Sequence, residues 1–155
     1  MSPAGPDIAD IRALRDRISD EIVATPVMRC AAIEEAIGGE TRVFAKLEFL
    51  QRTGTFKARG ALATLYALPP DRLASGVTAV SAGNHAIATA FAAQALGTSA
   101  KVVMIQSANP YRIEACRSYG AEVVLADDVH AAFEIAERIQ EEEGRHFVHP
   151  FEGPE

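Results

Sequence analysis

The chain has 155 residues, of which 48% are hydrophobic, and a formal net charge of −6 at pH 7. This length suits about one domain with a packed core, while the acidic balance, without a block of lysines and arginines, argues against a nucleic-acid surface. No stretch approaches the roughly 20 apolar residues of a membrane span, and the start of the chain lacks the basic and apolar regions of a signal peptide. The two cysteines are far apart and favour neither a disulfide framework nor a zinc site. We therefore expect a cytoplasmic protein without a metal.

The N-terminal third is predicted to contain two helices and a strand. Apolar residues recur every three or four positions over residues 8–22, which predicts an amphipathic helix that ends before Thr25-Pro26. A short helix is expected over Ala31–Ile37, with Gly38-Gly39 as its C-cap. The apolar run at residues 43–47 is typical of a strand.

The remaining sequence alternates between helical and strand patterns. A helix over 56–67 is expected to end at Pro69-Pro70. Beyond it, three predicted strands alternate with three predicted helices, and these lie at 77–81, 84–96, 101–106, 110–119, 122–126 and 129–143. This order predicts βαβ units, and therefore an α/β fold with a parallel sheet flanked by helices. Phe147-Val148 is a candidate for a fourth strand.

One lysine stands out in the segment from residue 48 to residue 61. Lys57 follows the apolar Phe56 and lies two residues before the cationic Arg59, and such neighbours lower the preference of an amine for its charged form. A neutral amine can attack an aldehyde and form a Schiff base. The ordinary alternative is a solvated lysine at the start of a helix.

A second segment has the pattern of a strand, a tight turn and a helix. The strand at 77–81 runs into Ala82-Gly83-Asn84-His85 and an alanine-rich helix. Such a turn presents backbone N–H groups and a helix N-terminus, which favour a bound carboxylate or phosphate. Ordinary helix capping by a glycine and an asparagine is the alternative.

Together, the two segments resemble the serine/threonine dehydratase branch of the fold-type II, tryptophan-synthase-β-like enzymes that use pyridoxal 5'-phosphate. Motifs in the order and approximate spacing of that family are Thr25-Pro26-Val27, Lys46-Leu47-Glu48, residues 51–61, residues 81–86, residues 119–124 and His149-Pro150-Phe151. The resemblance covers nearly the whole chain. It implies a three-layer α/β fold, with a parallel sheet and flanking helices.

The resemblance also implies roles for individual residues. Lys57 is expected to bind the cofactor as a Schiff base and to remove the Cα proton of the substrate. Phe56 is expected beside the pyridine ring, and Asn84 is expected to donate a hydrogen bond to the phenolic oxygen of that ring. The turn that binds the substrate carboxylate would consist of Ser81, Ala82, Gly83, Asn84 and His85.

The reaction implied is β-elimination from a small hydroxy amino acid such as L-threonine or L-serine, which yields a 2-oxo acid and ammonia. Ala82 stands where serine racemases of this family tend to carry a second serine as an acid, so the sequence favours elimination over racemisation. Thr55 replaces the serine usual before Phe-Lys and retains the hydroxyl. An amino-acid racemase remains the alternative activity.

The family has a glycine-rich phosphate-binding loop and a later Ser or Cys at the pyridine nitrogen, both after the His-Pro-Phe motif, and neither occurs before Glu155. We therefore expect three parts: an N-terminal segment of the large domain over 1–52, a small α/β domain over 53–150, and the start of a crossover over 151–155. Ile8, Leu14 and Ile18 are expected to expose an apolar face. A homo-oligomer is expected for the complete enzyme, and a catalytically incomplete fragment is the alternative to an enzyme.

Overall fold

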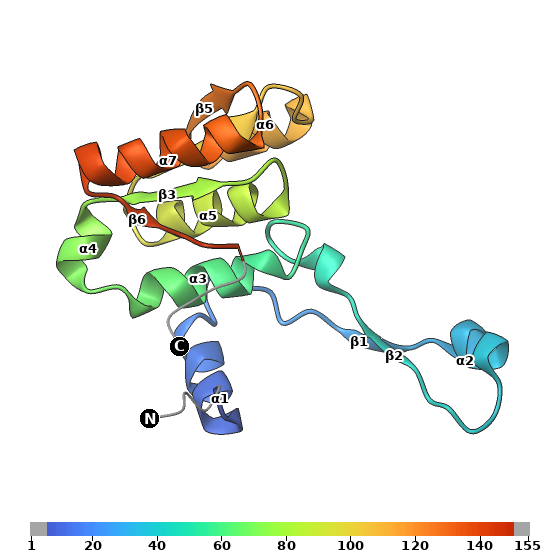
Figure 1. Cartoon of the computed structure of the whole chain (residues 1–155). Coiled ribbons are helices and arrows are strands. Elements are labelled where there is room, and N and C mark those ends of the chain that lie inside the picture. The colour runs from blue at the N-terminus through green and yellow to red at the C-terminus, as the bar shows by residue number, and fades with distance from the viewer. Residues whose placement is uncertain (1–5, 151–155) are drawn as a thin grey trace.

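The computed structural model describes residues 6–150. The first five residues and the predicted crossover at 151–155, with Phe151 of the His-Pro-Phe motif, lie outside the described residues. The body of the molecule is an α/β sandwich, from which a narrow arm projects (Figure 1).

A parallel four-stranded sheet forms the centre of the body. Its strands are β3 (Val77–Val80), β4 (Ala100–Ile105), β5 (Glu122–Ala126) and β6 (His146–Phe147), in the order β5-β4-β3-β6. Each neighbouring pair is parallel. The predicted parallel sheet is confirmed, and the candidate fourth strand lies beside β3, shifted by one residue to His146–Phe147.

Helices cover both faces of this sheet and complete three layers (Figure 1). One face packs against α5 (Asn84–Ala95), which in turn contacts α3 (Lys57–Ala67) and α6 (Pro110–Ser118). The other face packs against α7 (Val129–Glu143). Nine residues of α5 are buried, and five of them are alanines, so α5 fits between the sheet and α3. The expected fold class is confirmed.

The first helix is shorter than predicted. Helix α1 (Ile8–Arg17) ends at Arg17, and its C-cap Ile18 is only 2% exposed. The chain turns after Ile18 because this side chain enters the core formed by α3 and α5. Ile8 is 61% exposed, as expected, and Leu14 is partly buried, whereas the expectation that Ile18 is exposed is wrong.

The arm consists of a short hairpin and one helix (Figure 1). Strand β1 (Val27–Arg29) pairs antiparallel with β2 (Phe44–Lys46), and α2 (Ala31–Ile37) lies between them. The sequence did not predict β1, the 3₁₀ helix η1 (Glu48–Leu50) or α4 (Pro70–Ala74). Gly38 ends α2 with φ 77°, which confirms the predicted glycine cap. The division into domains stays a prediction.

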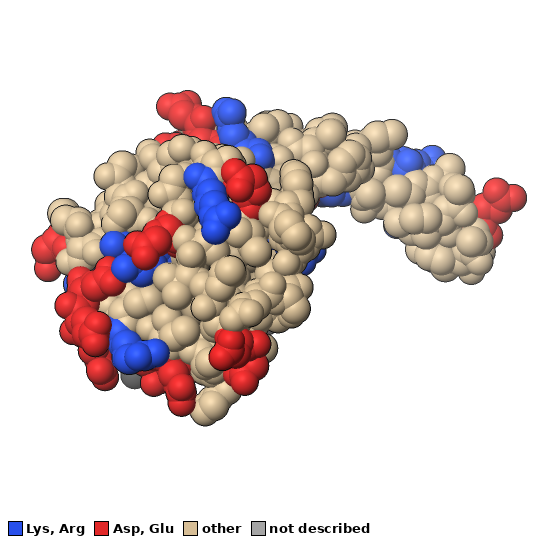
Figure 2. All heavy atoms as spheres, turned by 90° about the horizontal axis from the view of Figure 1, so that it is seen from above, with Lys and Arg blue, Asp and Glu red and all other residues tan. Residues whose placement is uncertain are grey.

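Figure 2 shows acidic and basic side chains interspersed over one face of the body. Among the charged side chains of residues 6–150, Lys101 pairs with Glu122 and with Glu143, and Arg145 pairs with Glu143. No helix within residues 6–150 has the length and apolar character needed to cross a membrane.

Candidate active site

An ion pair anchors the chain segment that precedes Lys57. Glu48 accepts hydrogen bonds from Nε and Nη2 of Arg59, each at 2.9 Å, and another from the Thr25 hydroxyl. The Arg59 hydrogen bond lowers the pKa of Glu48 to about 2, against a smaller opposing effect of burial. Arg59 also donates to the Val23 carbonyl. Arg59 therefore holds the segment before α3, a role that the sequence analysis did not assign to it.

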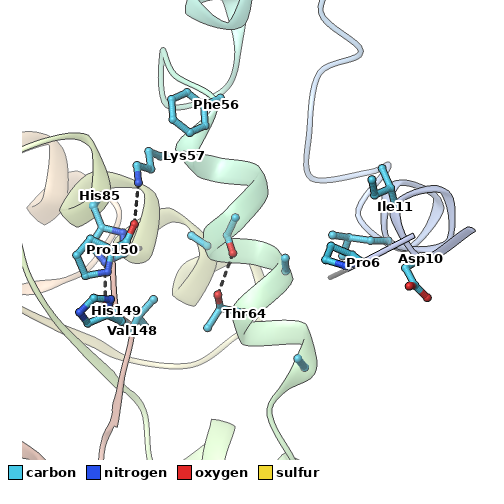
Figure 3. A pocket seen from close by; sticks show the side chains of 15 residues that line it. Pro6, Asp10, Ile11, Phe56, Lys57, Thr64, His85, Val148, His149 and Pro150 are labelled. Carbon is cyan, nitrogen blue, oxygen red and sulfur yellow. Dashed lines mark hydrogen bonds between the residues drawn. The ribbon is translucent and has the colours of Figure 1, made fainter. Parts of the chain in front are cut away.

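Lys57 begins α3, and its amine points toward the end of β6 (Figure 3). Its Nζ atom donates a hydrogen bond to the Pro150 carbonyl at 2.9 Å. The Phe56 ring centroid lies 5.6 Å from Nζ, and this ring is 60% exposed. Lys57 thus presents its amine beside a flat apolar ring that can contact a ligand.

Lys57, Phe56 and His85 line one cavity of about 500 Å³. Val148, His149 and Pro150 form another part of its wall, and α1 contributes Asp10 and Ile11 on the opposite side (Figure 3). Four segments that lie far apart in the sequence therefore line the cavity that contains the lysine.

The turn from Ser81 to His85 follows β3 at the carboxyl edge of the sheet. The Ser81 hydroxyl accepts a hydrogen bond from the Gly83 N–H at 3.1 Å. Gly83 is the N-cap of α5 and supplies no side-chain cap to the helix. The first turn of α5 therefore presents N–H groups and the positive end of the helix dipole to an anion.

His85 is 8% exposed and faces the core rather than solvent. Its Nε2 atom lies 2.9 Å from the Val148 carbonyl oxygen, and since a carbonyl can only accept, Nε2 carries the proton. Burial lowers the pKa of His85 and outweighs the opposing effect of the hydrogen bond to Val148, and the charges of Lys57 and His149 lower the pKa further. The neutral imidazole thus ties the turn to the end of β6, and its side chain is not aimed at the solvent side of the turn.

Asn84 is exposed and lies apart from the lysine cavity. It lines a neighbouring cavity of about 650 Å³, together with residues 52–55 of the loop before α3. The structure therefore brings Lys57, Phe56 and His85 into one cavity and places Asn84 in the next. Ser81, Ala82 and Gly83 are partly buried in the turn between β3 and α5.

Sequence reasoning missed two features of this region. The carbonyls of Val148 and Pro150 hold His85 and Lys57, although the His-Pro-Phe motif that marks this segment was recognised without a role. Arg112 on α6 donates from Nη1 to the Ala82 carbonyl at 3.3 Å. The sequence offered only a basic residue in a helix as a signal for Arg112.

The residues present fit part of pyridoxal 5'-phosphate. A lysine amine, an apolar ring beside it and a helix N-terminus without a side-chain cap suit an aldehyde, an aromatic ring and an anionic group. Gly38-Gly39 does not serve as a phosphate cradle at this place, because Gly38 caps α2 in the arm. Within the described residues, no group of three or more His, Cys, Asp or Glu side chains is arranged to hold a metal ion.

Comparison with known proteins identifies the family of this chain. Residues 18–155 match the family described as pyridoxal-phosphate dependent enzyme. A phenylserine dehydratase from Ralstonia pickettii is 53% identical over 148 residues, which cover 96% of this chain and 45% of the relative. An L-threonine ammonia-lyase from Geobacter sulfurreducens is 41% identical over 145 residues, which cover 93% of this chain and 36% of the relative.

Solved structures give the same result. Maize serine racemase matches with a TM-score of 0.88 and 33% identity, over 97% of this chain and 45% of the racemase. The T.th. threonine deaminase matches with a TM-score of 0.83 and 40% identity, over 96% of this chain and 46% of the deaminase. The chain spans less than half the length of these relatives. It belongs to the pyridoxal-phosphate dependent enzymes of fold-type II, whose cofactor is pyridoxal 5'-phosphate.

Proposed function

We propose that this chain forms the N-terminal half of a dehydratase that removes the β-hydroxyl of a hydroxy amino acid and releases a 2-oxo acid and ammonia. The observation that carries the proposal is that Lys57 and His85, the last residue of the Ser81–His85 turn, line one cavity at the end of β6, where the Pro150 carbonyl holds the Lys57 amine at 2.9 Å. The names of two relatives, a phenylserine dehydratase and an L-threonine ammonia-lyase, support the reaction class.

In this proposal Lys57 has two tasks. Its amine holds the cofactor covalently, and after release it takes the proton from the substrate Cα. The Pro150 carbonyl orients the amine, because it accepts a hydrogen bond from one N–H group and thereby fixes the direction of the other N–H groups. When bound, pyridoxal 5'-phosphate supplies the electron sink for the reaction at Cα.

The remaining roles are proposed from the resemblance of the sequence to the family and from the chemistry of the side chains. Phe56 covers one side of the cofactor ring with its exposed face. Asn84 hydrogen-bonds the oxygen of that ring from the neighbouring cavity. The turn of Ser81, Ala82, Gly83 and the N-terminus of α5 binds the substrate carboxylate, because N–H groups and the helix dipole favour an anion there.

A racemase is the second candidate, because the fold superposes on maize serine racemase with a TM-score of 0.88. Ala82 carries no group that can donate a proton, which favours elimination. We also propose a cytoplasmic location and a homo-oligomer for the complete enzyme. The separation into residues 1–52 and 53–150 is likewise proposed.

The role of Lys57 can be tested on this chain directly, because it has three lysines. Lys46 donates to the Thr25 carbonyl at 2.8 Å, and Lys101 is paired with Glu122 and Glu143. We expect pyridoxal 5'-phosphate, followed by borohydride reduction and peptide mass mapping, to label Lys57 well above the other two. Lys57→Arg keeps the charge and should abolish most of the label, whereas Lys46→Arg and Lys101→Arg should not.

The reaction is tested with the complete enzyme. L-threonine and L-serine are supplied, and both the 2-oxo acid and the D-amino acid are measured. Formation of the 2-oxo acid that is lost in Lys57→Ala supports the dehydratase. A D-amino acid as the main product would favour the racemase. In the labelling experiment on this chain, equal labelling of all three lysines would argue that the chain is a catalytically incomplete piece.

A further inference from the structure

The Ser81–His85 turn is held from two sides by residues that lie far away in the sequence. At its last residue, Nε2 of His85 donates a hydrogen bond to the Val148 carbonyl at 2.9 Å. Near its start, the Ala82 carbonyl accepts a hydrogen bond from Nη1 of Arg112 at 3.3 Å. His85 lines the lysine cavity, whereas Arg112 lines the neighbouring cavity. Arg112 thus holds one end of the turn, as Val148 holds the other.

The peptide unit between Ala82 and Gly83 is fixed at both of its polar groups. Its carbonyl accepts from Arg112, and its N–H donates to the Ser81 hydroxyl at 3.1 Å. A trans peptide is planar, with its C=O and N–H pointing in opposite directions, so these two bonds set the orientation of the whole unit. A Cβ at Gly83 would lie 3.4 Å from Nη1 of Arg112. The guanidinium therefore lies directly against this part of the turn.

Arg112 extends from a helix that is anchored to the core. Asn109 caps the start of α6 by accepting a hydrogen bond from a backbone N–H, and Cys116 is fully buried. At the C-cap of α6, the Tyr119 ring packs edge to face against Phe91 of α5, with centroids 5.5 Å apart and an interplanar angle of 72°. The packing of α6 against α5 therefore places Arg112 beside the turn.

Arg112 also brings a permanent positive charge to the turn. A guanidinium is not deprotonated in proteins and has five N–H donors, one of which reaches the Ala82 carbonyl. The side chain lines the cavity of about 650 Å³ that Asn84, the first residue of α5, also lines. The charge therefore adds to the positive end of the α5 dipole, and both favour an anion at this turn.

We propose that Arg112 is a positioning residue for binding of the substrate carboxylate. This inference rests on the proposed function, in which the turn binds that carboxylate. Arg112 holds the Ala82 carbonyl on the side of α6 and so prevents the carbonyl oxygen from turning toward the anion. Without Arg112, the peptide unit between Ala82 and Gly83 can rotate, and the carboxylate loses both a nearby positive charge and a preorganised set of donors.

The kinetic test uses the complete enzyme with L-threonine and L-serine. Arg112→Met keeps an unbranched side chain but removes the charge and the donors. We expect it to raise KM about fivefold and to change kcat less than about twofold, because the carboxylate is bound alike before and during the reaction. Arg112→Lys retains a charged donor and should recover most of the affinity. Arg117→Met is the matched control, since Arg117 is also on α6 and its pair with Glu114, 3.9 Å apart, is exposed.

A second measurement tests the positioning itself and needs no turnover. Hydrogen exchange of the Gly83 N–H is followed by NMR in this chain. Release of the Ala82 carbonyl in Arg112→Met should loosen the hydrogen bond to Ser81 and make this exchange about fivefold faster. Arg117→Met should leave the exchange rate unchanged.

Equal falls in kcat for Arg112→Met and Arg112→Lys, with KM unchanged and less labelling of Lys57 by pyridoxal 5'-phosphate, would indicate a merely structural role and overturn the proposal while leaving the dehydratase intact. A raised KM with unchanged exchange at Gly83 would also overturn it, because Arg112 would then act through its charge alone. If the wild type converts neither substrate, the proposed function fails. The exchange rate of the Gly83 N–H in Arg112→Met and in Arg117→Met then decides whether Arg112 positions the turn.

Discussion

Replacing Glu48 by glutamine should reveal how much the ion pair with Arg59 stabilises the segment before the lysine. The substitution keeps the size of the side chain and removes its charge. Arg59 then loses a charged partner at 2.9 Å, and the Thr25 hydroxyl loses a charged acceptor. We expect Glu48→Gln to be less stable than the wild type at pH 7.

The pKa of Glu48 gives the size of this effect. Its fall from 4.5 to about 2 corresponds to at most about 3–4 kcal/mol. The Glu48 side chain is 18% exposed, and its partner Arg59 is 28% exposed, so solvent screening reduces the expected loss to about 1–2 kcal/mol. The folded pKa is below the unfolded one, so this stability is present above pH 4.5 and is lost as the pH falls toward 2.

The assay is urea unfolding of the 155-residue chain at pH 7 and pH 3. The difference between wild type and Glu48→Gln should be about 1–2 kcal/mol at pH 7 and about half of that or less at pH 3. Glu35→Gln, at an exposed position on α2, is the control and should change stability by less than about 0.5 kcal/mol. A difference that is the same at both pH values would refute the argument from the pKa of Glu48.

Three further predictions concern the core and the edge of the sheet. Burial keeps the pKa of His85 below 6.5, so the neutral His85 stabilises the fold less as the pH falls below 6.5. His85→Gln should therefore reduce the dependence of the unfolding free energy on pH between pH 7 and pH 5. Burial also lowers the pKa of His146, which should account for part of the dependence that remains. Burial raises the pKa of Cys116 to about 11, whereas Cys30 is partly exposed. Iodoacetamide at pH 8 should therefore alkylate Cys30 and leave Cys116 unmodified until urea is added, as measured by peptide mass. Labelling of both cysteines in the native chain would contradict this prediction. Gly76→Ala should lower the free energy of unfolding by about 1–3 kcal/mol, because φ is +84° and the new Cβ would lie against the Arg145 guanidinium and 2.6 Å from the Ser99 hydroxyl oxygen. Gly97→Ala, where φ is +68° and the space around the new Cβ is open, should lower it by about 1 kcal/mol. Equal losses of stability for the two variants in thermal unfolding would exclude a steric origin.

Local sequence patterns were sufficient for the body of the fold. Strand β5 and helix α7 have the bounds expected from the sequence, and the alternation of strands and helices correctly predicted the parallel sheet. These elements are specified locally, because their apolar spacing and caps lie within the segment itself. The same holds for the glycine that ends α2.

Elements that depend on distant partners were missed or misplaced. Strand β1 has three exposed residues and exists by pairing with β2, so no local alternation marks it. The end of α1 is set by the burial of Ile18 against α3 and α5. Helix α4 begins at Pro70 with Pro69 as its N-cap, whereas the sequence pattern at these two prolines predicts only the end of α3.

The candidate residues of the site could be named without coordinates, because Lys57 and the Ser81–His85 turn belong to short contiguous motifs. Their arrangement in space could not. Lys57 is held by a carbonyl 93 residues away, and His85 by one 63 residues away. The same contacts turn His85 into the core and leave Asn84 in a separate cavity. A local pattern contains no information about such contacts, since they form only when β6 pairs with β3 and brings Val148 and Pro150 to the carboxyl edge of the sheet.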